Sequence, residues 1–389
     1  NLENIPYTSS YTNAAGEKVE DQLQIALTIV DPTNGYVVAM IGGAGEKVVD
    51  RGWNWAVNAR QCGSAIKPVS TYAPALDNGT INGASVIDDY PMLLNGEVWP
   101  RNANWRYQGL TALHTAIAQS LNTCAVRTNL AYGVSNSYDF LVDKLGFENL
   151  TYTDSQQVGN MALGGFEKGV TTEEMSAAYA AFVNEGVYTK PRTFIRVEDA
   201  NGNVVLENEA QSTVAMKNTT AAIINHLLQE AALNGTGYEA QFSGMHIAGK
   251  TGSTNSNKDR YFVGYTPYYS CAVWAGYEHN QRIVASGNPC SAVFRKVMSA
   301  IHEDLPDKDF FSCSGLTSVS VCADSGMLAS ENCALDVRGS RVYTALVAAD
   351  NAPTAVCTMH TAPTYTVNMA DSDGNVTTVT GSVLNYQRE

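Results

Sequence analysis

The chain has 389 residues, and 24 lysines and arginines against 38 aspartates and glutamates give it a formal net charge of −14. This negative balance disfavours a nucleic-acid backbone as a partner. The long apolar runs, such as residues 25–30 and 177–183, are far shorter than the roughly 20 residues that span a bilayer. With 44% hydrophobic and 9% aromatic residues, the chain has the apolar surface that a large folded core requires.

The N-terminal stretch is expected to be a linker. It lacks the basic region, apolar segment and small-residue cleavage site of a secretory signal. Residues 7–13 are polar and rich in Tyr, Ser and Thr. We therefore predict a linker over residues 1–22, in a fragment of a longer protein.

The first predicted elements are two strands followed by a helix. Gln24–Val30 and residues 36–41 are β-rich and are joined by an Asn-Gly turn, which is typical of a hairpin. After Gly63 the apolar residues recur at spacings of three and four, which predicts a helix that ends at residue 78. Pro74 is expected to bend the end of that helix because proline lacks a backbone N–H.

The middle of the chain is predicted to be helical. Four segments with helical apolar spacing are each followed by a Gly or Asn. They cover residues 111–120, 125–132, 137–145 and 172–184. We expect a helical subdomain at about residues 80–185 that interrupts the strands of the sheet.

The next part of the chain returns to strands. Residues 194–197 and 204–206 flank an Asn-Gly turn and predict a second hairpin, and residues 219–233 predict an amphipathic helix. Three further strands and a helix are expected at residues 261–265, 270–276, 282–285 and 291–303. Together these elements predict an α/β fold with a mainly antiparallel five-stranded sheet flanked by helices.

A change of composition after Leu305 predicts a domain boundary. The remaining residues are rich in Ser, Thr, Ala and Cys, and residues 364–369 and 376–383 alternate as strands do. We therefore divide the chain into a core domain at residues 23–305 and a small, β-rich C-terminal extension at residues 306–389.

Ser64 and Lys67 form the one Ser-x-x-Lys motif of the chain, at the predicted start of a helix. A spacing of three places the hydroxyl and the amine on one helical face. Serine becomes a nucleophile when a neighbouring base removes its proton. Lysine can be that base if burial or a nearby cation lowers its pKa. A helix cap followed by a surface lysine is the alternative interpretation of this motif taken alone.

Lys250 lies in the segment Gly249-Lys250-Thr251-Gly252-Ser253. Glycines allow another backbone to approach closely, and hydroxyls beside a lysine suit a carboxylate ligand. The segment that begins at Gly244 also satisfies the spacing of a nucleotide-binding P-loop. The glycine and polar residues that follow cannot begin the helix that a P-loop needs, so this interpretation is disfavoured.

A third motif, Ser120-x-Asn122, lies between the other two. The same tripeptide pattern occurs elsewhere in the chain, so its position in the order of motifs is what counts. With all three motifs in this order, residues 23–305 resemble the transpeptidase domain of class A, bifunctional penicillin-binding proteins. The resemblance extends to the flanks of the motifs, at residues 60–68, 120–123, 162–165, 167–171, 248–253 and 261–267.

The resemblance implies a fold like that of penicillin-binding proteins and serine β-lactamases, and acyl transfer on peptidoglycan stem peptides. Ser64 would attack the carbonyl between two terminal D-alanines, and Lys67 would accept the hydroxyl proton. Ser120 would relay a proton to the leaving amine. Asn122 would orient Lys67 and the substrate amide.

The resemblance also implies roles for the Lys-Thr-Gly segment. Lys250 would keep Lys67 less basic, and Thr251 and Ser253 would bind the terminal carboxylate, with Gly252 between them. Ser253 stands where relatives more often have Thr. Backbone N–H groups of Ser64 and Ser253 would form the oxyanion hole. No cofactor and no metal is implied at this site.

The implied partners are stem peptides, as D-Ala-D-Ala donor and amine acceptor, and β-lactam antibiotics, which would acylate Ser64. The implied location is the extracytoplasmic face of a bacterial membrane, reached through an N-terminal anchor that is not in this chain, as is the glycosyltransferase domain. A D,D-carboxypeptidase and a serine β-lactamase are alternatives, although residues 150–180 contain no Glu-x-x-x-Asn deacylation signature. A non-catalytic wall-binding module would need none of the three motifs.

The eight cysteines form no Cys-x-x-Cys pair. Cys62 and Cys124 lie two residues from the first and second motifs, and buried free thiols are favoured there over a disulfide. Cys322, Cys333 and Cys357-x-x-His360 resemble the cysteine-containing tails of some class A proteins. Disulfides are the favoured prediction for this tail. A Cys3His zinc site is the alternative, disfavoured because the spacings are long and irregular.

Overall fold

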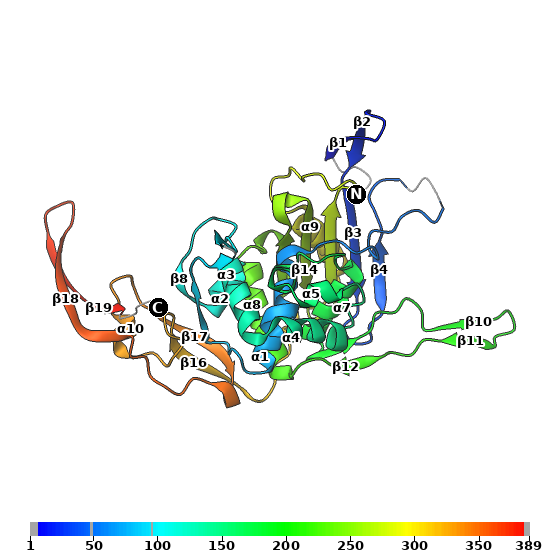
Figure 1. Cartoon of the computed structure of the whole chain (residues 1–389). Helices are drawn as coiled ribbons and strands as arrows, with labels where there is room; N and C mark the ends of the chain where they lie inside the picture. Colours follow the sequence, from blue (N-terminus) through cyan, green and yellow to red (C-terminus); the bar gives the residue numbers. More distant parts are fainter. Residues whose placement is uncertain (1–6, 47–49, 95, 385–389) are drawn as a thin grey trace.

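The computed structural model describes residues 7–46, 50–94 and 96–384 (Figure 1). At its centre is an antiparallel five-stranded sheet with the order β13-β14-β15-β3-β4. The strands are β13 (Ala248–Ser253), β14 (Asp259–Tyr265), β15 (Ser270–Gly276), β3 (Gln24–Val30) and β4 (Val37–Ile41). This sheet and the helices around it confirm the predicted fold class.

Helices cover both faces of the sheet. Successive side chains of a strand point to opposite faces, so Leu27 packs in the cluster that contains Phe294 of α9, whereas Ala26 packs in the larger cluster on the other face. The covering helices are α7 (Thr172–Val183), α8 (Asn218–Leu233) and α9 (Pro289–Ile301). The start of α7 is defined by a capping box between Thr171 and Glu174.

Most of the remaining helices lie in the region predicted to be helical. They are α2 (Leu113–Ala118), α3 (Asn122–Tyr132), α4 (Val134–Asp139), α5 (Tyr152–Ser155) and α6 (Val158–Leu163), with a π-helical turn, η3 (Phe140–Lys144). The first part of this region is not helical, because it contains two small paired sheets. These are β5 (Val86–Asp89) with β8 (Gly109–Ala112), and β6 (Leu93–Leu94) with β7 (Glu97–Val98).

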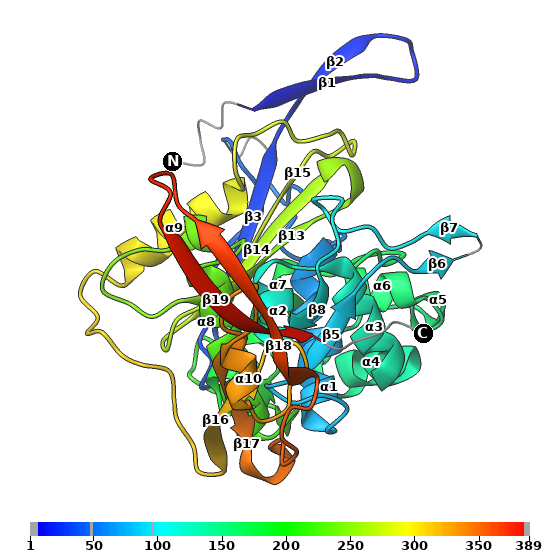
Figure 2. The same cartoon turned by 90° about the vertical axis from the view of Figure 1, so that its left-hand side faces the viewer.

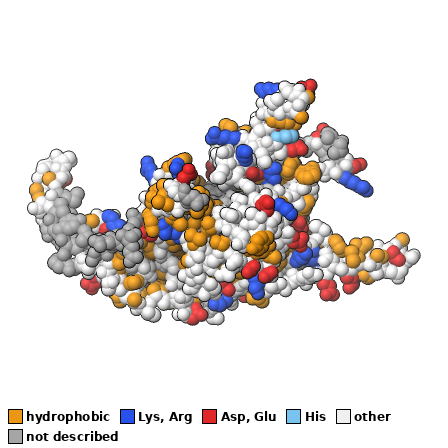
Figure 3. Space-filling model, viewed as in Figure 1, with side chains coloured by type: hydrophobic (Ala, Val, Ile, Leu, Met, Phe, Trp, Pro, Cys, Tyr) orange, Lys and Arg blue, Asp and Glu red, His pale blue; other side chains and the backbone are white. Residues whose placement is uncertain are grey.

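Three further hairpins or short pairs lie at the surface. They are β1 (Thr8–Thr12) with β2 (Lys18–Gln22), β9 (Val187–Thr189) with β12 (Ser212–Val214), and β10 (Arg196–Glu198) with β11 (Val204–Glu207). The β1–β2 hairpin falls in the stretch predicted to be a linker. The β10–β11 hairpin projects from the body (Figure 1), and Figure 3 shows hydrophobic side chains along it. Val205 and Leu206 of β11 are exposed.

The helix predicted after Gly63 is divided into three short segments. A 3-10 turn, η1 (Gly63–Ile66), is followed by a π-helical turn, η2 (Pro68–Tyr72), and by α1 (Ala73–Asp77). Pro68 and Pro74 each remove a backbone donor, which accounts for the change of helix type at both places.

The prediction of a strand at residues 282–285 is wrong, because this segment is not a strand. The segment pairs with no described strand. Its Ile283 N–H donates to the Asn257 carbonyl at 2.9 Å, and the Ile283 side chain is buried in the cluster that contains Phe294. Val284 is 77% exposed. The fifth strand of the sheet is β13, whose many small residues gave a weak strand pattern.

The C-terminal extension forms two separate strand pairs at one end of the molecule (Figures 1 and 2). They are β16 (Leu316–Cys322) with β17 (Val342–Ala348), and β18 (His360–Ala370) with β19 (Val376–Leu384), and a short helix, α10 (Glu331–Ala334), lies between β16 and β17 in sequence. Ala84 of the core packs with Val321 and Val347 of the extension. The extension therefore shares a small apolar cluster with the core.

Among the helices of residues 7–46, 50–94 and 96–384, none has both the length and the apolar character that crossing a bilayer demands.

Gly83 permits the docking of the extension, because a Cβ at this position would lie 1.9 Å from the Leu346 carbonyl oxygen. We expect Gly83→Ala to weaken docking, at a cost of about 1–3 kcal/mol for an overpacked contact. Hydrogen–deuterium exchange should then rise in β16 and β17. Gly202→Ala, in the open turn of the β10–β11 hairpin, is the control and should leave that exchange unchanged; equal protection in both variants would contradict this account.

Candidate active site

The turn η1, which contains Ser64 and is called the Ser64 turn below, contacts strand β13 at glycine residues of both segments. A Cβ on Gly252 would lie 2.1 Å from the Cys62 carbonyl oxygen, and one on Gly63 would lie 2.4 Å from the Ser253 carbonyl oxygen. Gly63 also has a φ of 54°, which favours glycine. The first and third motifs are thus in direct backbone contact, although they lie far apart in the sequence.

Lys67 connects the first motif to the second. Its amine is fully buried and donates hydrogen bonds to the Ser120 carbonyl at 2.8 Å and to Asn122 Oδ1 at 2.7 Å. Two longer contacts of 3.4 Å reach Ser120 Oγ and the Leu121 carbonyl. The side chains of Ser120 and Asn122 therefore meet at the Lys67 amine.

Both lysines have lowered pKa values. Burial, and secondarily the charge of Lys250, hold the pKa of Lys67 well below its usual range. Burial lowers the pKa of Lys250 to about 7. A neutral amine has two N–H donors and one lone pair. The two short bonds of Lys67 need only two donors, so the neutral form of the amine would keep a lone pair to accept a proton.

Ser120 and Asn122 are held by the junction between α2 and α3. Ser120 has a φ of 58°, a left-handed conformation that turns the chain between the two helices. The Asn122 backbone N–H donates to Asn102 Oδ1 at 2.8 Å, and its side-chain amide donates to the Arg101 carbonyl at 2.8 Å. Sequence analysis missed Arg101 and Asn102, which lie in a loop with no motif.

The hydroxyls of the third motif have partners that sequence analysis also missed. Thr251 Oγ1 donates to Thr236 Oγ1 at 2.8 Å, and Arg260 Nη1 donates to Ser253 Oγ at 3.2 Å. Arg260 pairs directly with Ser253 in the β13–β14 register. Because this pairing comes from the strand register, which was not predicted, no signal in the sequence indicated it. This end of β13 therefore combines hydroxyls with a cation, which suits a carboxylate.

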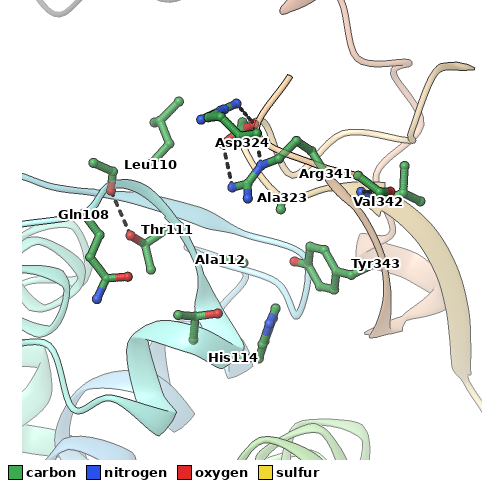
Figure 4. Close-up of a pocket in the computed structure, with 14 residues that line it drawn as sticks. Gln108, Leu110, Thr111, Ala112, His114, Ala323, Asp324, Arg341, Val342 and Tyr343 are labelled. Carbon is green, nitrogen blue, oxygen red and sulfur yellow. Dashed lines mark hydrogen bonds and ion pairs between the residues drawn. The ribbon is translucent and has the colours of Figure 1, made fainter. Parts of the chain in front are cut away.

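A groove of about 520 Å³ opens at this junction. Its lining includes Ser64, Trp99, Arg101, Asn122, Asn160 and Ser253. Lys67 and Lys250 are fully buried and do not line it. A larger pocket of about 850 Å³ lies between β8 and the C-terminal extension (Figure 4). It contains none of the residues predicted from the motifs, so we assign the candidate active site to the smaller groove.

All eight cysteines lie in the described residues and none is in a disulfide. Cys62 and Cys124 are buried free thiols, as predicted, and burial raises the pKa of both, that of Cys124 to about 12. The disulfides predicted for the tail are wrong. Three of its four cysteines instead converge with His360, at a distance from the groove, and in the described residues the side-chain groups that can hold a metal are confined to this tail.

Comparison with known proteins identifies the family. The model of the penicillin binding protein transpeptidase domain matches residues 25–299. The chain belongs to the penicillin-binding protein transpeptidase family. A second model, that of the penicillin-binding protein 1A C-terminal domain, matches residues 312–362. Together these matches confirm the resemblance to class A penicillin-binding proteins, which take part in peptidoglycan synthesis.

Two curated relatives are named penicillin-binding protein 1A. The protein from Clostridium perfringens is 35% identical over 383 residues, which cover 94% of this chain and 45% of the relative. The protein from Clostridium novyi is 34% identical over 374 residues, covering 92% of this chain and 42% of the relative. The chain therefore spans less than half the length of these relatives.

Solved structures share the fold. Penicillin-binding protein 1A from Haemophilus influenzae superposes with a TM-score of 0.72 at 22% identity, over 90% of this chain and 57% of that chain. PonA1 from Mycobacterium tuberculosis, solved in complex with penicillin V, superposes with a TM-score of 0.64 at 24% identity, over 76% of this chain and 82% of that chain.

Substitution of Gly252 tests whether the close contact between β13 and the Ser64 turn is needed for acylation. Because a Cβ there would meet the Cys62 carbonyl, we expect Gly252→Ala to push β13 away from the Ser64 turn and to slow acylation by a fluorescent penicillin by about 10-fold or more, equivalent to at least about 1.4 kcal/mol in the barrier. Gly165→Ala is the matched control, since it lines the same groove and its Cβ would meet no atom closer than 3.8 Å. Equal labelling rates in the two variants would refute the geometric argument.

Proposed function

We propose that the chain is a serine D,D-transpeptidase that cross-links peptidoglycan stem peptides through an acyl-enzyme on Ser64. The observation that carries the proposal is the Lys67 amine, which is buried, has a lowered pKa and spends its two donors on Ser120 and Asn122. Lys67 lies three residues after Ser64, at the end of the same turn, and its backbone N–H bonds to the Ser64 carbonyl.

In the first step, Ser64 Oγ attacks the carbonyl carbon between the two terminal D-alanines of a stem peptide. Lys67 takes the hydroxyl proton as the new C–O bond forms. The C–N bond then breaks, and the proton passes through the Ser120 hydroxyl to the leaving amine. The products are free D-alanine and an ester between the shortened peptide and Ser64.

Two further groups of atoms assist this step. The backbone N–H groups of Ser64 and Ser253 are the proposed oxyanion hole, and the close approach of Gly63 to the Ser253 backbone supports this pairing. Thr251 and Ser253 bind the terminal carboxylate. Lys250, which is buried and does not line the groove, supplies positive charge that keeps Lys67 less basic and attracts the carboxylate without contacting it. The glycine at position 252 allows that segment to lie against the Ser64 turn. Arg260 adds positive charge at the same end of the strand.

In the second step, an amine from a neighbouring stem peptide attacks the ester. A new peptide bond forms, and Ser64 regains its proton. β-Lactams acylate Ser64 in the same way and leave slowly. We propose that this chemistry takes place at the extracytoplasmic face of a bacterial membrane. We place the transpeptidase domain at residues 23–305, after a linker at residues 1–22 and before an extension at residues 306–389.

Covalent labelling tests the nucleophile. Incubation with a fluorescent penicillin should yield one adduct, and mass mapping should assign it to Ser64. Ser64→Ala should remove the label, whereas Ser70→Ala, which alters a buried hydroxyl bonded to the Met161 carbonyl, should retain it. An adduct on another residue, or equal labelling of Ser64→Ala, would reject the mechanism and leave a non-catalytic wall-binding module as the better account.

The fate of the acyl group separates the related activities. With a D-Ala-D-Ala peptide donor and an added amine acceptor, we expect a new peptide bond. Release of D-alanine without aminated product would indicate a D,D-carboxypeptidase. Rapid loss of the penicillin adduct would indicate a β-lactamase.

The two lysines predict a specific pH dependence. Acylation efficiency should fall in acid, because protonation of Lys67 removes the base, and it should fall above pH about 7, because Lys250 then loses the charge that attracts the carboxylate. Lys250→Arg should keep the acid limb and lose the alkaline one, since a guanidinium stays charged. The second-order rate constant of penicillin acylation across pH is the measurement. An alkaline limb that persists in the variant would show that Lys250 does not cause it.

A further inference from the structure

Four side chains that offer metal ligands converge inside the C-terminal extension. Cys322, Cys333, Cys357 and His360 are all buried, and their ligand atoms lie within 4.8 Å of one another. They come from four places: the end of β16, helix α10, the loop before β18, and the first residue of β18. The catalytic proposal uses none of them.

The distances within this cluster fit a tetrahedral metal ion. His360 Nδ1 lies 3.5 Å from Cys322 Sγ and 3.7 Å from Cys357 Sγ. Zinc bonds of about 2.3 Å to sulfur and about 2.0 Å to nitrogen, at tetrahedral angles, place those atoms roughly 3.5 Å apart. The observed separations therefore match those of two ligands of one zinc ion.

Two carboxylates lie beside the other ring nitrogen of His360, Nε2. His360 Nε2 lies 3.0 Å from Asp336 Oδ2 and 3.2 Å from Asp324 Oδ2. A histidine that binds zinc usually directs its other nitrogen at a carboxylate, which fixes the tautomer and leaves the first nitrogen for the metal. Nδ1 therefore faces the sulfurs and Nε2 faces the carboxylates at ion-pair distance, although neither Nε2 contact has hydrogen-bond geometry in the described residues.

The two carboxylates are not themselves the better metal site. Arg338 Nη2 lies 2.7 Å from Asp324 Oδ2, and Arg338 Nε lies 2.8 Å from Asp336 Oδ1. Arg341 Nη2 lies 2.9 Å from Asp324 Oδ1. These guanidinium groups already offset the negative charge that a cation would need. The carboxylates therefore orient His360, and the thiols form the side of the cluster that lacks a cation.

Hydrogen-bond donors lie beside two of the sulfurs. The Asp324 backbone N–H lies 3.4 Å from Cys322 Sγ, and the Ser330 backbone N–H lies 3.4 Å from Cys333 Sγ. The Ser330 hydroxyl also lies 3.3 Å from Cys333 Sγ. Donors aimed at sulfur stabilise the charge of a metal-bound thiolate.

We propose that Cys322, Cys333, Cys357 and His360 bind a structural zinc ion. Each thiol releases its proton to solvent as its sulfur binds, and no redox step is involved. A disulfide explains the cluster less well, because three sulfurs share one centre and any pair would leave a buried third. Cys313, the fourth cysteine of the tail, lies outside the cluster and is partly exposed.

The zinc ion would reinforce segments that backbone bonds already connect, such as those from Arg341 N–H to the Cys333 carbonyl (2.9 Å) and from Cys357 N–H to the Leu328 carbonyl (2.8 Å). It ties the end of β16 to α10 and to the start of β18. It also fixes the Asp324–Arg341 ion pair, which forms one wall of the 850 Å³ pocket (Figure 4). Because metal binding free energy becomes folding free energy in small modules, we expect loss of zinc to unfold the extension before the core.

The test uses the whole chain, purified with reductant and without chelator. Elemental analysis should find one zinc per chain after addition of zinc chloride and desalting. Substitution by cobalt should give the visible absorption bands of tetrahedral thiolate coordination. Zinc should protect three thiols from alkylation and leave Cys313 reactive, and removal of zinc by a chelator should lower the first thermal unfolding transition.

Matched variants identify the ligands. Cys333→Ser and His360→Ala should lose bound zinc, whereas Cys313→Ser should keep it. Asp336→Asn should keep all four ligands but weaken zinc affinity by about 10–100-fold. Penicillin labelling of each variant reports whether the core is folded. A wild-type chain without zinc, a native disulfide between any two cluster cysteines, or full zinc occupancy in Cys333→Ser would overturn the proposal.

Discussion

Two lysine amines are buried beside each other, and the chemistry of the groove depends on this placement. Lys67 and Lys250 bond to carbonyl, amide or hydroxyl oxygens, and among the described residues no carboxylate perturbs either amine. Burial without a counter-ion disfavours the charged form. This arrangement costs stability: as pH falls from the ordinary lysine pKa of 10.5 toward 7, the unfolded chain gains a proton that buried Lys250 does not, so the folded state loses stability. The same burial lowers the pKa of Lys67, which favours the neutral form that can act as a base.

Glycines around the groove allow the segments that carry the two lysines to lie close together. Two lysines from distant segments can share a dry site only if their backbones approach more closely than side chains allow. Gly63 and Gly252 remove the Cβ atoms at the contact, and Gly164 lies equally close to the Gly63 backbone. Three segments of the chain therefore meet at one turn, and the order of the motifs in the sequence becomes a spatial cluster.

Sequence patterns predicted the elements whose signals are local. The β-rich apolar run Gln24–Val30 and the apolar spacing that predicts helix α8 carry enough information to place both elements. The segment at residues 282–285 has strand composition but no partner, and composition cannot report pairing. Arg101 and Thr236 could not be predicted from the sequence for a similar reason. They belong to the site only through contacts that the tertiary fold creates. The three motifs were predictable because nucleophile, base and carboxylate binder require particular residue types.

The tail shows how irregular spacing conceals a compact cluster. Cys357 is brought to the cluster by its backbone bond to the Leu328 carbonyl, 2.8 Å long, and Cys333 by the short helix that follows Ser330. The described apolar clusters of the extension are small: one includes Ala84 of the core, and the other consists of the three cysteines with a few partly buried neighbours. A module with so little apolar surface needs another source of stability, such as a metal or a disulfide. The core does not, because its sheet buries side chains on both faces, and the cysteines it contains are isolated, buried thiols.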